Sequence, residues 1–438
     1  MTRAEQAARS IAAHLRAAGY VAYLAGGCVR DRLLGREPKD FDVATDAPAE
    51  VVQRCFAKTI PVGVQFGVVV VIFDEQPVEV ATFRSDSIYV DGRHPVTVRF
   101  STPQEDAQRR DFTINGMFLD PTNDNVIDYV GGQADLRAGV IRAIGDPAAR
   151  LHEDRLRMLR AVRFAARLGF RIDSATFEAI RRLAASIKDI AWERIGDEVV
   201  RMLCDSANGS ARIAFDLLDQ GGLLAPILPE VAAMKGVAQS PDYHPEGDVF
   251  VHTMLLLEQL DQPSESLALA ALLHDVAKPR CFQRREHRIT FYGHCELGAE
   301  MTVEICQRLR RSRETWERAG FLVKDHLQLT HAKEMRLSTL KRFLAHDAIE
   351  ELLALARLDA LASNQDLSHY DFCRQRLQEL SAEDIKPPPL LRGSDLIALG
   401  HEPGPRFKRI LNAVVEAQLE GTLHNREQAI EWVKSRFP

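Results

Sequence analysis

Two aspartates near the amino terminus, Asp40 and Asp42, stand one residue apart in a segment predicted to be a strand. Side chains at positions i and i+2 of a strand point the same way, so both carboxylates can hold divalent metal against a triphosphate. Glu79, on a later predicted strand, offers a third carboxylate that completes a two-metal site. These acids predict phosphoryl transfer, although an isolated D-x-D in a polar loop is more often solvated surface.

A paired glycine precedes the aspartates. Gly26 and Gly27 have no Cβ, so their backbone amides can approach a phosphate closely, and the segment that follows can open a helix toward the same anion. Arg30 in that segment adds a positive charge. The pattern is not the G-x-G-x-x-G of dinucleotide folds, so it indicates a phosphate site of another kind.

A second group of chemical residues lies in helical sequence, in the fragments YHPEGDVFVHTM, ALLHDVAKP, FYGHCELGA, LVKDHLQL and LARLDALAS. Imidazoles and carboxylates on separate helices are what a buried divalent-metal site requires. A lone histidine is more often a packed or surface residue, but the adjacent His274 and Asp275 favour the metal interpretation.

The elements that position these groups change in character along the chain. Short β-branched runs dominate residues 20–145, whereas the segments after Gly145 repeat apolar residues at three and four, which is typical of helices. The predicted fold class is therefore α+β: a small mixed sheet with helices, followed by an elongated helical body. The predicted parts are a head (1–145), a helical neck and body (146–235), a metal-binding helical domain (236–385) and a tail (386–438).

Composition excludes several classes of protein. The 438 residues are 46% hydrophobic and 27% charged, and no run of 18 apolar residues is present, so a membrane span is not expected. The net charge of −6 confines any polyanion site to a local patch. The seven cysteines form no C-x-x-C pair. The amino terminus has charges throughout its helical pattern and no signal-peptide core, which predicts a cytoplasmic protein.

The blocks LAGGCVRDRLLGREPKDFDVAT, EDAQRRDFTINGMFLD, HEDRLRMLRAVRFAARLGF and ERIGDEVVRML resemble the class II tRNA nucleotidyltransferase and bacterial poly(A) polymerase family. This family has a head like that of DNA polymerase beta. The resemblance implies that Asp40 and Asp42 bind catalytic Mg²⁺, with Glu79 as the third carboxylate. It assigns sugar and phosphate contacts to Arg110, Asp111 and Asn115.

The same resemblance assigns reading of the incoming base to Glu153, Asp154 and Arg157. At positions i and i+3 of one predicted helix, Asp154 and Arg157 can present an acceptor and donors to a base edge. Cytosine and adenine both show an amino donor beside a ring acceptor, so such a pair can accept C and A while rejecting U and G. Arg160 and Arg163 continue the helix and are predicted to reach the triphosphate or to hold this face in place.

Two details qualify the resemblance. Gly116 replaces the alanine that usually follows TIN in the family, which exchanges one small residue for another. The segment from Arg84 to Arg93 keeps the long form of a loop that is shortened in family members that add only the two cytidines. This long form is expected to be mobile and is compatible with addition of the terminal adenosine.

The histidine and aspartate fragments resemble the HD phosphohydrolase superfamily. The resemblance implies that His252, His274, Asp275 and Asp359 are metal ligands. His294 and His326 fit the extra ligand positions of its dinuclear members. The resemblance implies a divalent metal, namely Mn, Ni, Fe or Mg, and hydrolysis of phosphomonoesters or 2',3'-cyclic phosphates. The segment after residue 386 also resembles the tail of HD-bearing family members. It is expected either to contact tRNA or to be a capping subdomain.

These features predict a template-independent enzyme that adds or repairs the 3'-terminal CCA of tRNA from CTP and ATP. One alternative is an enzyme that adds adenosine alone, either an A-adding tRNA nucleotidyltransferase or a poly(A) polymerase. The acidic net charge mildly disfavours a general RNA polymerase. An alternative of another class is an HD phosphohydrolase that uses the head as an RNA-binding module.

Overall fold

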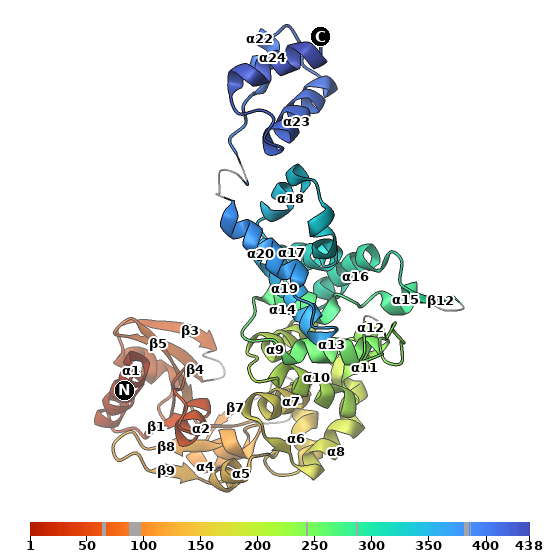
Figure 1. Ribbon diagram of the computed structural model, residues 1–438. Coiled ribbons are helices and arrows are strands. Elements are labelled where there is room, and N and C mark those ends of the chain that lie inside the picture. The colour runs from red at the N-terminus through yellow and green to blue at the C-terminus, as the bar shows by residue number, and fades with distance from the viewer. Residues whose placement is uncertain (64–66, 87–97, 242–243, 286–287, 381–384, 386) are drawn as a thin grey trace. The chain divides into compact units, whose positions relative to one another are not determined.

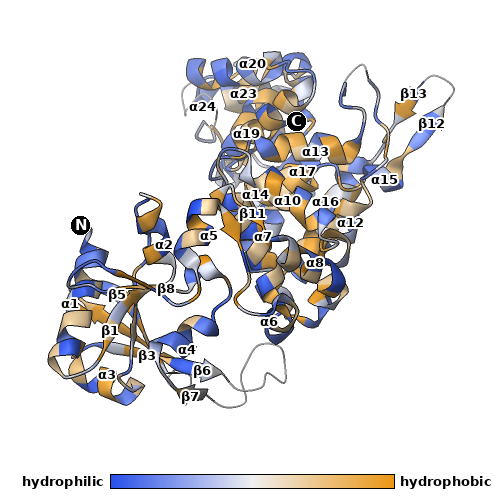
Figure 2. Cartoon of the chain, turned by 90° about the horizontal axis from the view of Figure 1, so that it is seen from below, coloured by the Kyte–Doolittle hydropathy of each residue, from blue (hydrophilic) through white to orange (hydrophobic). Residues whose placement is uncertain are grey.

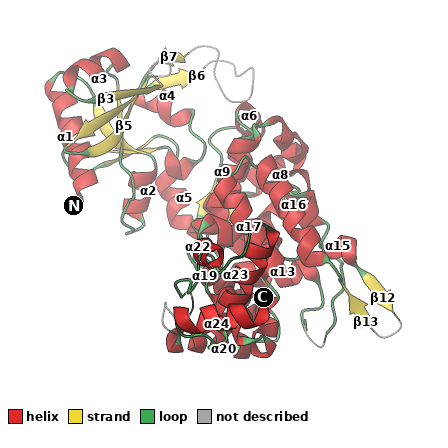
Figure 3. Cartoon of the chain, turned by 90° about the horizontal axis from the view of Figure 1, so that it is seen from above, coloured by secondary structure: helices red, strands yellow, loops and turns green. Residues whose placement is uncertain are grey.

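The computed structural model describes the whole chain except residues 64–66, 87–97, 242–243, 286–287, 381–384 and 386. Its contacts divide the chain into two compact units, Met1–Ala232 and Ala233–Pro438. Figures 1 and 3 show the strands concentrated near the amino terminus and helices thereafter. This confirms the predicted α+β class with a mostly helical body, while the finer division into four parts remains a prediction.

A mixed sheet of seven strands forms the centre of the head, in the order β3-β4-β5-β2-β1-β8-β9. Every neighbouring pair is antiparallel except β2 and β5. Val78 and Val80 of β5 are buried, so the alternation of a strand turns Glu79 to the other side. The strands are β1 (Ala22–Ala25), β2 (Asp42–Thr45), β3 (Thr59–Gly63), β4 (Val68–Phe73), β5 (Gln76–Thr82), β8 (Met117–Leu119) and β9 (Val126–Asp128).

Helix α1 (Arg3–Ala17) packs on this sheet against β1, β2 and β5. Thr2 caps its first turn by accepting a hydrogen bond from the Glu5 amide at 3.1 Å. Ile11 and Leu15 are fully buried, as expected for the apolar face of an amphipathic helix. The remaining small elements of the head are α2 (Gly27–Leu33), α3 (Ala49–Cys55), β6 (Arg84–Asp86), β7 (Val98–Phe100), α4 (Pro103–Gln108), η2 (Thr113–Asn115) and α5 (Gly132–Ala138).

Helix α7 (Leu156–Leu168) is the most buried helix of the first unit and packs against α9 and α10. It ends at Gly169, whose φ of 71° provides the left-handed cap that a residue with a Cβ adopts only at a cost. The other elements are β10 (Val140–Ile141), α6 (Pro147–Glu153), β11 (Arg171–Ile172), α8 (Ser174–Leu183), η3 (Ala184–Asp189), α9 (Trp192–Cys204), α10 (Ser210–Gln220), α11 (Leu224–Ile227) and α12 (Pro229–Ala232).

The second unit is built on helices whose apolar residues face several neighbours at once. Figure 2 shows the hydrophobic colouring of α13, and α14 is likewise almost entirely buried. Such helices belong to the interior of a bundle. The elements are α13 (Val249–Glu258), α14 (Glu265–Leu273), α15 (Lys278–Cys281), β12 (Gln283–Arg285), β13 (Arg288–Thr290), α16 (His294–Arg308), α17 (Arg313–Asp325), η4 (Gln328–Glu334), α18 (Leu337–Leu344), α19 (Ile349–Ala362) and α20 (Ser368–Glu379).

The last three helices enclose a small core of their own. Leu396, Ile410 and Val433 are buried there, and Trp432 and Phe407 pack against them. These helices are α22 (Gly393–Ala398), α23 (Pro405–Leu419) and α24 (Arg426–Arg436).

The body was predicted to be helical throughout. It departs from this prediction because β12 and β13 form a short antiparallel pair. Strands of three residues are too short to show alternation in the sequence. In the described part of the chain, no helix combines the length and apolarity needed to cross a membrane.

Candidate functional site

The register of the head sheet brings carboxylates together. Val43 of β2 pairs with Val80 of β5 in parallel, so Asp42 and Glu79, one residue earlier in each strand, lie side by side. Both line a cavity of about 630 Å³ together with Asp40. Because β2 begins at Asp42, Asp40 lies just before the strand, and the prediction that both aspartates share a strand is wrong for Asp40.

The electrostatics of these carboxylates suit a cation. Burial and the charges of Glu79 and Asp40 raise the pKa of Asp42 to about 6, against the opposing effect of Arg110. A divalent cation with oxygen ligands would offset this mutual repulsion, which is the ligand chemistry of Mg²⁺. The residues therefore fit a magnesium site in which Asp40, Asp42 and Glu79 would be the ligands.

The paired glycines turn the chain at the edge of the same cavity. Gly26 has a φ of 74°, and a Cβ there would lie 3.1 Å from the guanidinium of Arg110. Helix α2 starts at Gly27, earlier than predicted. Arg30 is buried, and its Nη1 donates to the side-chain oxygen of Asn115 at 2.7 Å. The turn thus lets two arginines reach the cavity beside the carboxylates.

Asp111 joins the head to the body through Arg160. Its Oδ2 accepts from Arg160 Nη2 at 2.6 Å, and its Oδ1 accepts from the Phe112 amide at 2.7 Å and from Asn115 at 3.1 Å. Burial raises its pKa, but Arg160 and these hydrogen bonds prevail and lower the pKa to about 2. Asp111 is therefore ionised, and it fixes the direction of the Arg160 guanidinium.

Asp154 and Arg157 both line the cavity, but they do not lie on one helix. Helix α6 ends at Glu153, Asp154 is extended, and α7 begins at Leu156. Asp154 Oδ1 accepts from the Leu156 amide at 3.1 Å, a local bond from backbone to side chain that favours a turn over a continuous helix. Its Oδ2 lies 2.9 Å from Nη2 of Arg194. The prediction of one continuous helix is wrong here.

The Arg157 guanidinium is held by three acceptors. Nη1 donates to the Glu153 carboxylate at 2.7 Å and to the Arg150 carbonyl at 2.8 Å, while Nη2 donates to the Arg109 carbonyl at 3.1 Å. A guanidinium bound in this way is fixed in direction before any ligand arrives. Arg157 therefore presents its remaining donors to the cavity from a set position.

The HD residues converge in the second unit, as predicted. His252 lies on α13, His274 and Asp275 follow α14, and Asp359 lies on α19. Nδ1 of His274 lies 3.0 Å from the Ala271 carbonyl, whereas its Nε2 is buried with no hydrogen-bond partner among the described residues. This arrangement selects the tautomer whose Nε2 lone pair can bind a metal.

His294 and His326 repeat this arrangement. Nδ1 of His294 lies 2.8 Å from the Phe291 carbonyl, and Nδ1 of His326 lies 2.6 Å from the Val323 carbonyl. Burial and the neighbouring His274 lower the pKa of His326 to about 4, which keeps its imidazole neutral. Both histidines thus have the form that metal ligation requires.

Asp275 lies between two pairs of imidazoles. Its Oδ2 is 3.2 Å from His274 Nε2 and 4.0 Å from His252 Nε2, and its Oδ1 is 3.7 Å from His294 Nε2 and 4.0 Å from His326 Nε2. A carboxylate whose two oxygens face different ligand pairs can bridge two metal ions. The donor set therefore fits a dinuclear centre of divalent metals.

Buried charges around this centre are compensated. Burial opposes the charged form of His252, but the carboxylates of Asp359 and Glu246, each 2.9 Å away, raise its pKa to about 10. Nζ of Lys278 lies 2.7 Å from Asp275 Oδ2. Without a metal, protons and a lysine provide the positive charge that these carboxylates need.

Three family models match the chain. They describe the poly A polymerase head domain over residues 22–142, a probable RNA- and SrmB-binding site of polymerase A over 169–235, and the HD domain over 247–364.

Relatives of three kinds are similar to it. The CCA-adding enzyme of Bacillus velezensis is 30% identical over 96% of both chains. The A-adding tRNA nucleotidyltransferase of Deinococcus radiodurans is 34% identical over 94% of this chain and 95% of its own. Poly(A) polymerase I of Escherichia coli O6:H1 is 44% identical over 50% of this chain, which spans about half (48%) of that relative's length. This chain belongs to the class II tRNA nucleotidyltransferase and bacterial poly(A) polymerase family.

Solved structures agree with this assignment. The CCA-adding enzyme of Bacillus stearothermophilus in complex with CTP superposes with a TM-score of 0.76 at 27% identity, over 100% of this chain and 98% of that one.

Glu153, predicted to read the base, and Arg163, predicted either to reach the triphosphate or to hold this face in place, are not among the described residues that line the cavity. Glu153 bonds to Arg150 and Arg157. Arg163 is buried and pairs with Glu198 at 2.6 Å. Both therefore hold the cavity wall in position, and a direct contact with nucleotide stays a prediction for them.

Other cavity residues were absent from the predicted set. Phe164 follows Arg163 on α7, and Arg84 and Arg109 adjoin predicted blocks, so their neighbours are a signal that could have found them. Arg201, on α9, has no such local signal. Among the described residues, the charged ones that line the cavity are Arg30, Arg84, Arg109, Arg110, Arg157, Arg160 and Arg201, with Asp40, Asp42, Glu79, Asp111 and Asp154.

The HD domain of this nucleotidyltransferase also has residues that the sequence did not single out. His244 and Glu246 form a possible ligand group with His252, and Lys278 contacts Asp275. A cavity of about 430 Å³ opens beside the centre, lined by His244, His326, Asp359, Asn364, His369 and Tyr370 among others. The long loop predicted between Arg84 and Arg93 lies, after residue 86, outside the described residues.

Proposed function

We propose that this nucleotidyltransferase adds or repairs the 3'-terminal CCA of tRNA, using CTP and ATP. The proposal is based on one cavity whose described lining combines three clustered carboxylates, Asp154, and seven arginines that include Arg157. Guanidinium groups suit a triphosphate, and the carboxylates suit the metal that accompanies it. The similarity to CCA-adding enzymes over the full chain supports this substrate class.

In this proposal each part of the cavity has a separate task. Asp40, Asp42 and Glu79 would hold Mg²⁺, which when bound supplies charge neutralisation at the triphosphate and activation of the RNA 3' hydroxyl. The arginines bind and align the phosphates so that the hydroxyl attacks the α-phosphorus and pyrophosphate leaves. Asp154 accepts from the amino group of cytosine or adenine, and Arg157 donates to the ring acceptor beside it.

The resemblance to an A-adding enzyme at 34% identity keeps an adenosine-only activity as the rival proposal. The same residues would serve both activities, since Asp154 and Arg157 accept either base. The distinction lies in whether CTP is used on a tRNA that lacks the two cytidines.

We also propose a phosphohydrolase activity for the HD domain, with the metal held by His252, His274, Asp275 and Asp359. The specific observation is that Nε2 of His252 and Nε2 of His274 converge on the buried carboxylate of Asp275, while the Ala271 carbonyl fixes the tautomer of His274. Mn, Ni, Fe or Mg would suit these ligands. If this were the chain's only chemistry, the head would serve as an RNA-binding module.

The test offers tRNA transcripts that end at the discriminator base, at C or at CC, with CTP and ATP separately and together, and sequences the products. The proposal predicts CTP use on the first two transcripts and ATP use on the third. Asp42→Asn should abolish addition. Asp74→Asn is the matched control, because it removes a carboxylate from the exposed turn between β4 and β5. ATP use alone would favour the adenosine-only rival, and hydrolysis without addition would favour the RNA-binding head.

A further inference from the structure

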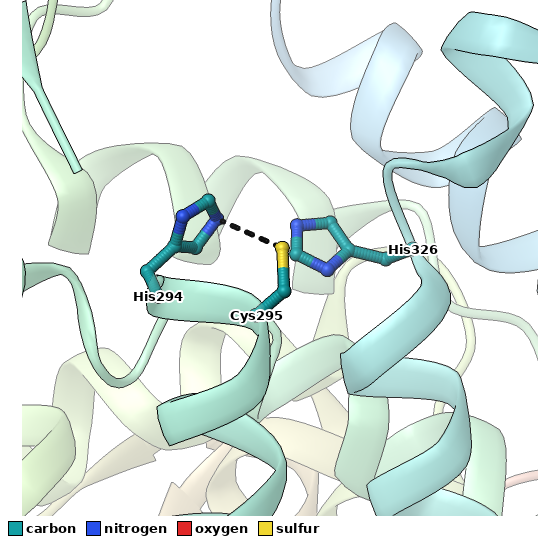
Figure 4. A group of neighbouring side chains, drawn as sticks. All are labelled: His294, Cys295 and His326. Atoms are coloured by element: carbon teal, nitrogen blue, oxygen red, sulfur yellow. Dashed lines mark hydrogen bonds between the residues drawn. The ribbon is translucent and has the colours of Figure 1, made fainter. Parts of the chain in front are cut away.

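Cys295 lies beside the HD ligands but belongs to none of the predicted sets. It occupies the first turn of α16, directly after His294, and His326 follows the neighbouring helix α17. Figure 4 shows its sulfur between the two imidazole rings. The possible ligand atoms of the three residues all lie within 4.8 Å of one another. Two helices thus bring a thiol to the same point as two metal-competent imidazoles.

The spacing fits coordination. Cys295 Sγ lies 3.7 Å from His294 Nε2. A sulfur and a nitrogen bound to one tetrahedral Zn²⁺, at its usual bond lengths, lie about 3.5 Å apart. Nδ1 of each histidine is engaged with a backbone carbonyl, so Nε2 is the atom left for the metal.

Asp275, in the middle of the HD centre, offers a candidate fourth ligand. Asp275 is 1% exposed, and its Oδ1 has no hydrogen-bond partner among the described residues while facing His294 and His326. An unpartnered buried carboxylate oxygen is costly unless a cation or donor meets it. Two nitrogens and one sulfur therefore surround this point, and an oxygen of Asp275 faces both nitrogens.

The other half of the centre has a different character. His252, His274 and Asp359 form a ligand group of nitrogen and oxygen atoms alone. Such a set suits Mn, Fe, Ni or Mg, whereas a thiolate shifts preference toward zinc and other thiophilic cations. The two halves share Asp275, but only one of them contains a soft sulfur ligand.

We propose that Cys295 is a metal ligand, and that His294, Cys295, His326 and Asp275 form a zinc-selective half of a mixed dinuclear centre. The thiol gives up its proton on binding, and the thiolate bonds the cation. This proposal rests on the HD centre and is independent of nucleotide addition by the head.

Cobalt provides the direct test, since a Co²⁺–thiolate bond produces a sulfur-to-cobalt charge-transfer band in the near ultraviolet that nitrogen and oxygen ligands do not. Full-length protein loaded with Co²⁺ should show this band. Cys295→Ser and Cys295→Ala should lose it, and their affinity for Zn²⁺ should fall by about tenfold or more. Cys281→Ser is the matched control, because Cys281 is a partly exposed cysteine on α15 outside the ligand group.

A second measurement uses the unmodified protein and so avoids any folding defect of the variants. Zn²⁺ should protect Cys295, but not Cys281, from alkylation, as read by peptide mass mapping. Absence of the band in the wild type, its persistence in Cys295→Ser, or equal alkylation of Cys295 with and without Zn²⁺ would each overturn the proposal. CTP and ATP addition, measured in parallel, should be unchanged in Cys295→Ser, which separates this proposal from the function of the head.

Discussion

The head cavity and the HD centre arrange charge around their carboxylates in opposite ways. The head cavity is lined by seven arginines beside a cluster of three acids. The HD centre buries Asp275 among four imidazoles and one lysine. Oxygen ligands with surrounding guanidinium groups suit Mg²⁺ and a polyphosphate, whereas imidazoles suit transition metals. Ligand type, more than net charge, therefore distinguishes the two candidate metal sites of this acidic chain.

The linings of the two cavities also differ in their positively charged side chains. Among the described residues that line the 430 Å³ cavity of the HD domain, none is an arginine or a lysine. Such a wall offers little compensation for the charges of a triphosphate. The head therefore has the chemistry for nucleoside triphosphates, and the HD cavity favours ligands of lower charge.

The largest expected effect comes from a conservative substitution that should impair the head cavity and leave the HD centre unchanged. Asp42→Asn removes one carboxylate oxygen from the head cluster, and nucleotide addition should fall by at least about 1,000-fold, because metal ions contribute several kcal/mol of charge stabilisation. Single-turnover addition to a tRNA transcript measures this, with Asp74→Asn as the control. A matching loss of Mn²⁺ binding at the HD centre would contradict the separation.

Metal binding to the HD centre should stabilise only the unit that contains it. At a Mn²⁺ concentration about 100 times its Kd, the free energy of unfolding should rise by about 2.7 kcal/mol. Thermal unfolding with Mn²⁺ and with a chelator measures the change. His274→Ala should abolish it and Asp42→Asn should retain it. An equal increase in His274→Ala would place the stabilising metal elsewhere.

Base selection should be sensitive to Arg157. A pair of hydrogen bonds to a base edge contributes about 1–3 kcal/mol of discrimination, so Arg157→Ala should lower the preference for CTP over UTP by about 5- to 150-fold. The ratio of kcat/KM for the two nucleotides is the measurement, because a general loss of folded enzyme cancels in it. Arg167→Ala, on the same helix and outside the cavity lining, is the control. An equal decline for both nucleotides would mean that Arg157 does not read the base.

The smallest effect is expected from Arg194, which acts through Asp154 as a positioning residue. Their 2.9 Å ion pair is partly exposed, so it contributes about 1 kcal/mol or less. Arg194→Ala should reduce the CTP preference about fivefold at most, and Arg194→Lys should recover part of the loss. If Arg194→Ala lost more selectivity than Arg157→Ala, Arg194 rather than Arg157 would be the residue that reads the base.

The sequence could predict that these candidate metal ligands lie together, because each is carried by a local motif. Asp42 and Glu79 lie on strands whose alternation fixes their face, and His274 with Asp275 lies in one short apolar segment. Their convergence required only that the predicted elements form.

The remainder depends on tertiary structure. Asp154 was expected inside a helix because the periodicity of HEDRLRMLR is continuous, but the hydrogen bond from the Leu156 amide to its own carboxylate favours a turn at this point. Arg201 reaches its site by packing between distant elements, for which no local spacing exists. Lys278, in contrast, lies three residues after Asp275, so this local spacing could have found it. The sequence could predict that Arg163 matters. Only its buried ion pair with Glu198 shows that it supports the cavity wall rather than lining the cavity.

The most direct test of the account is to incubate a tRNA transcript that ends at the discriminator base with CTP and ATP together and to sequence the products. A CCA-adding enzyme should give a product extended by CCA alone in the wild type and in Asp74→Asn, and no extended product in Asp42→Asn. Extension by adenosines only, or no extension by the wild type, would contradict it.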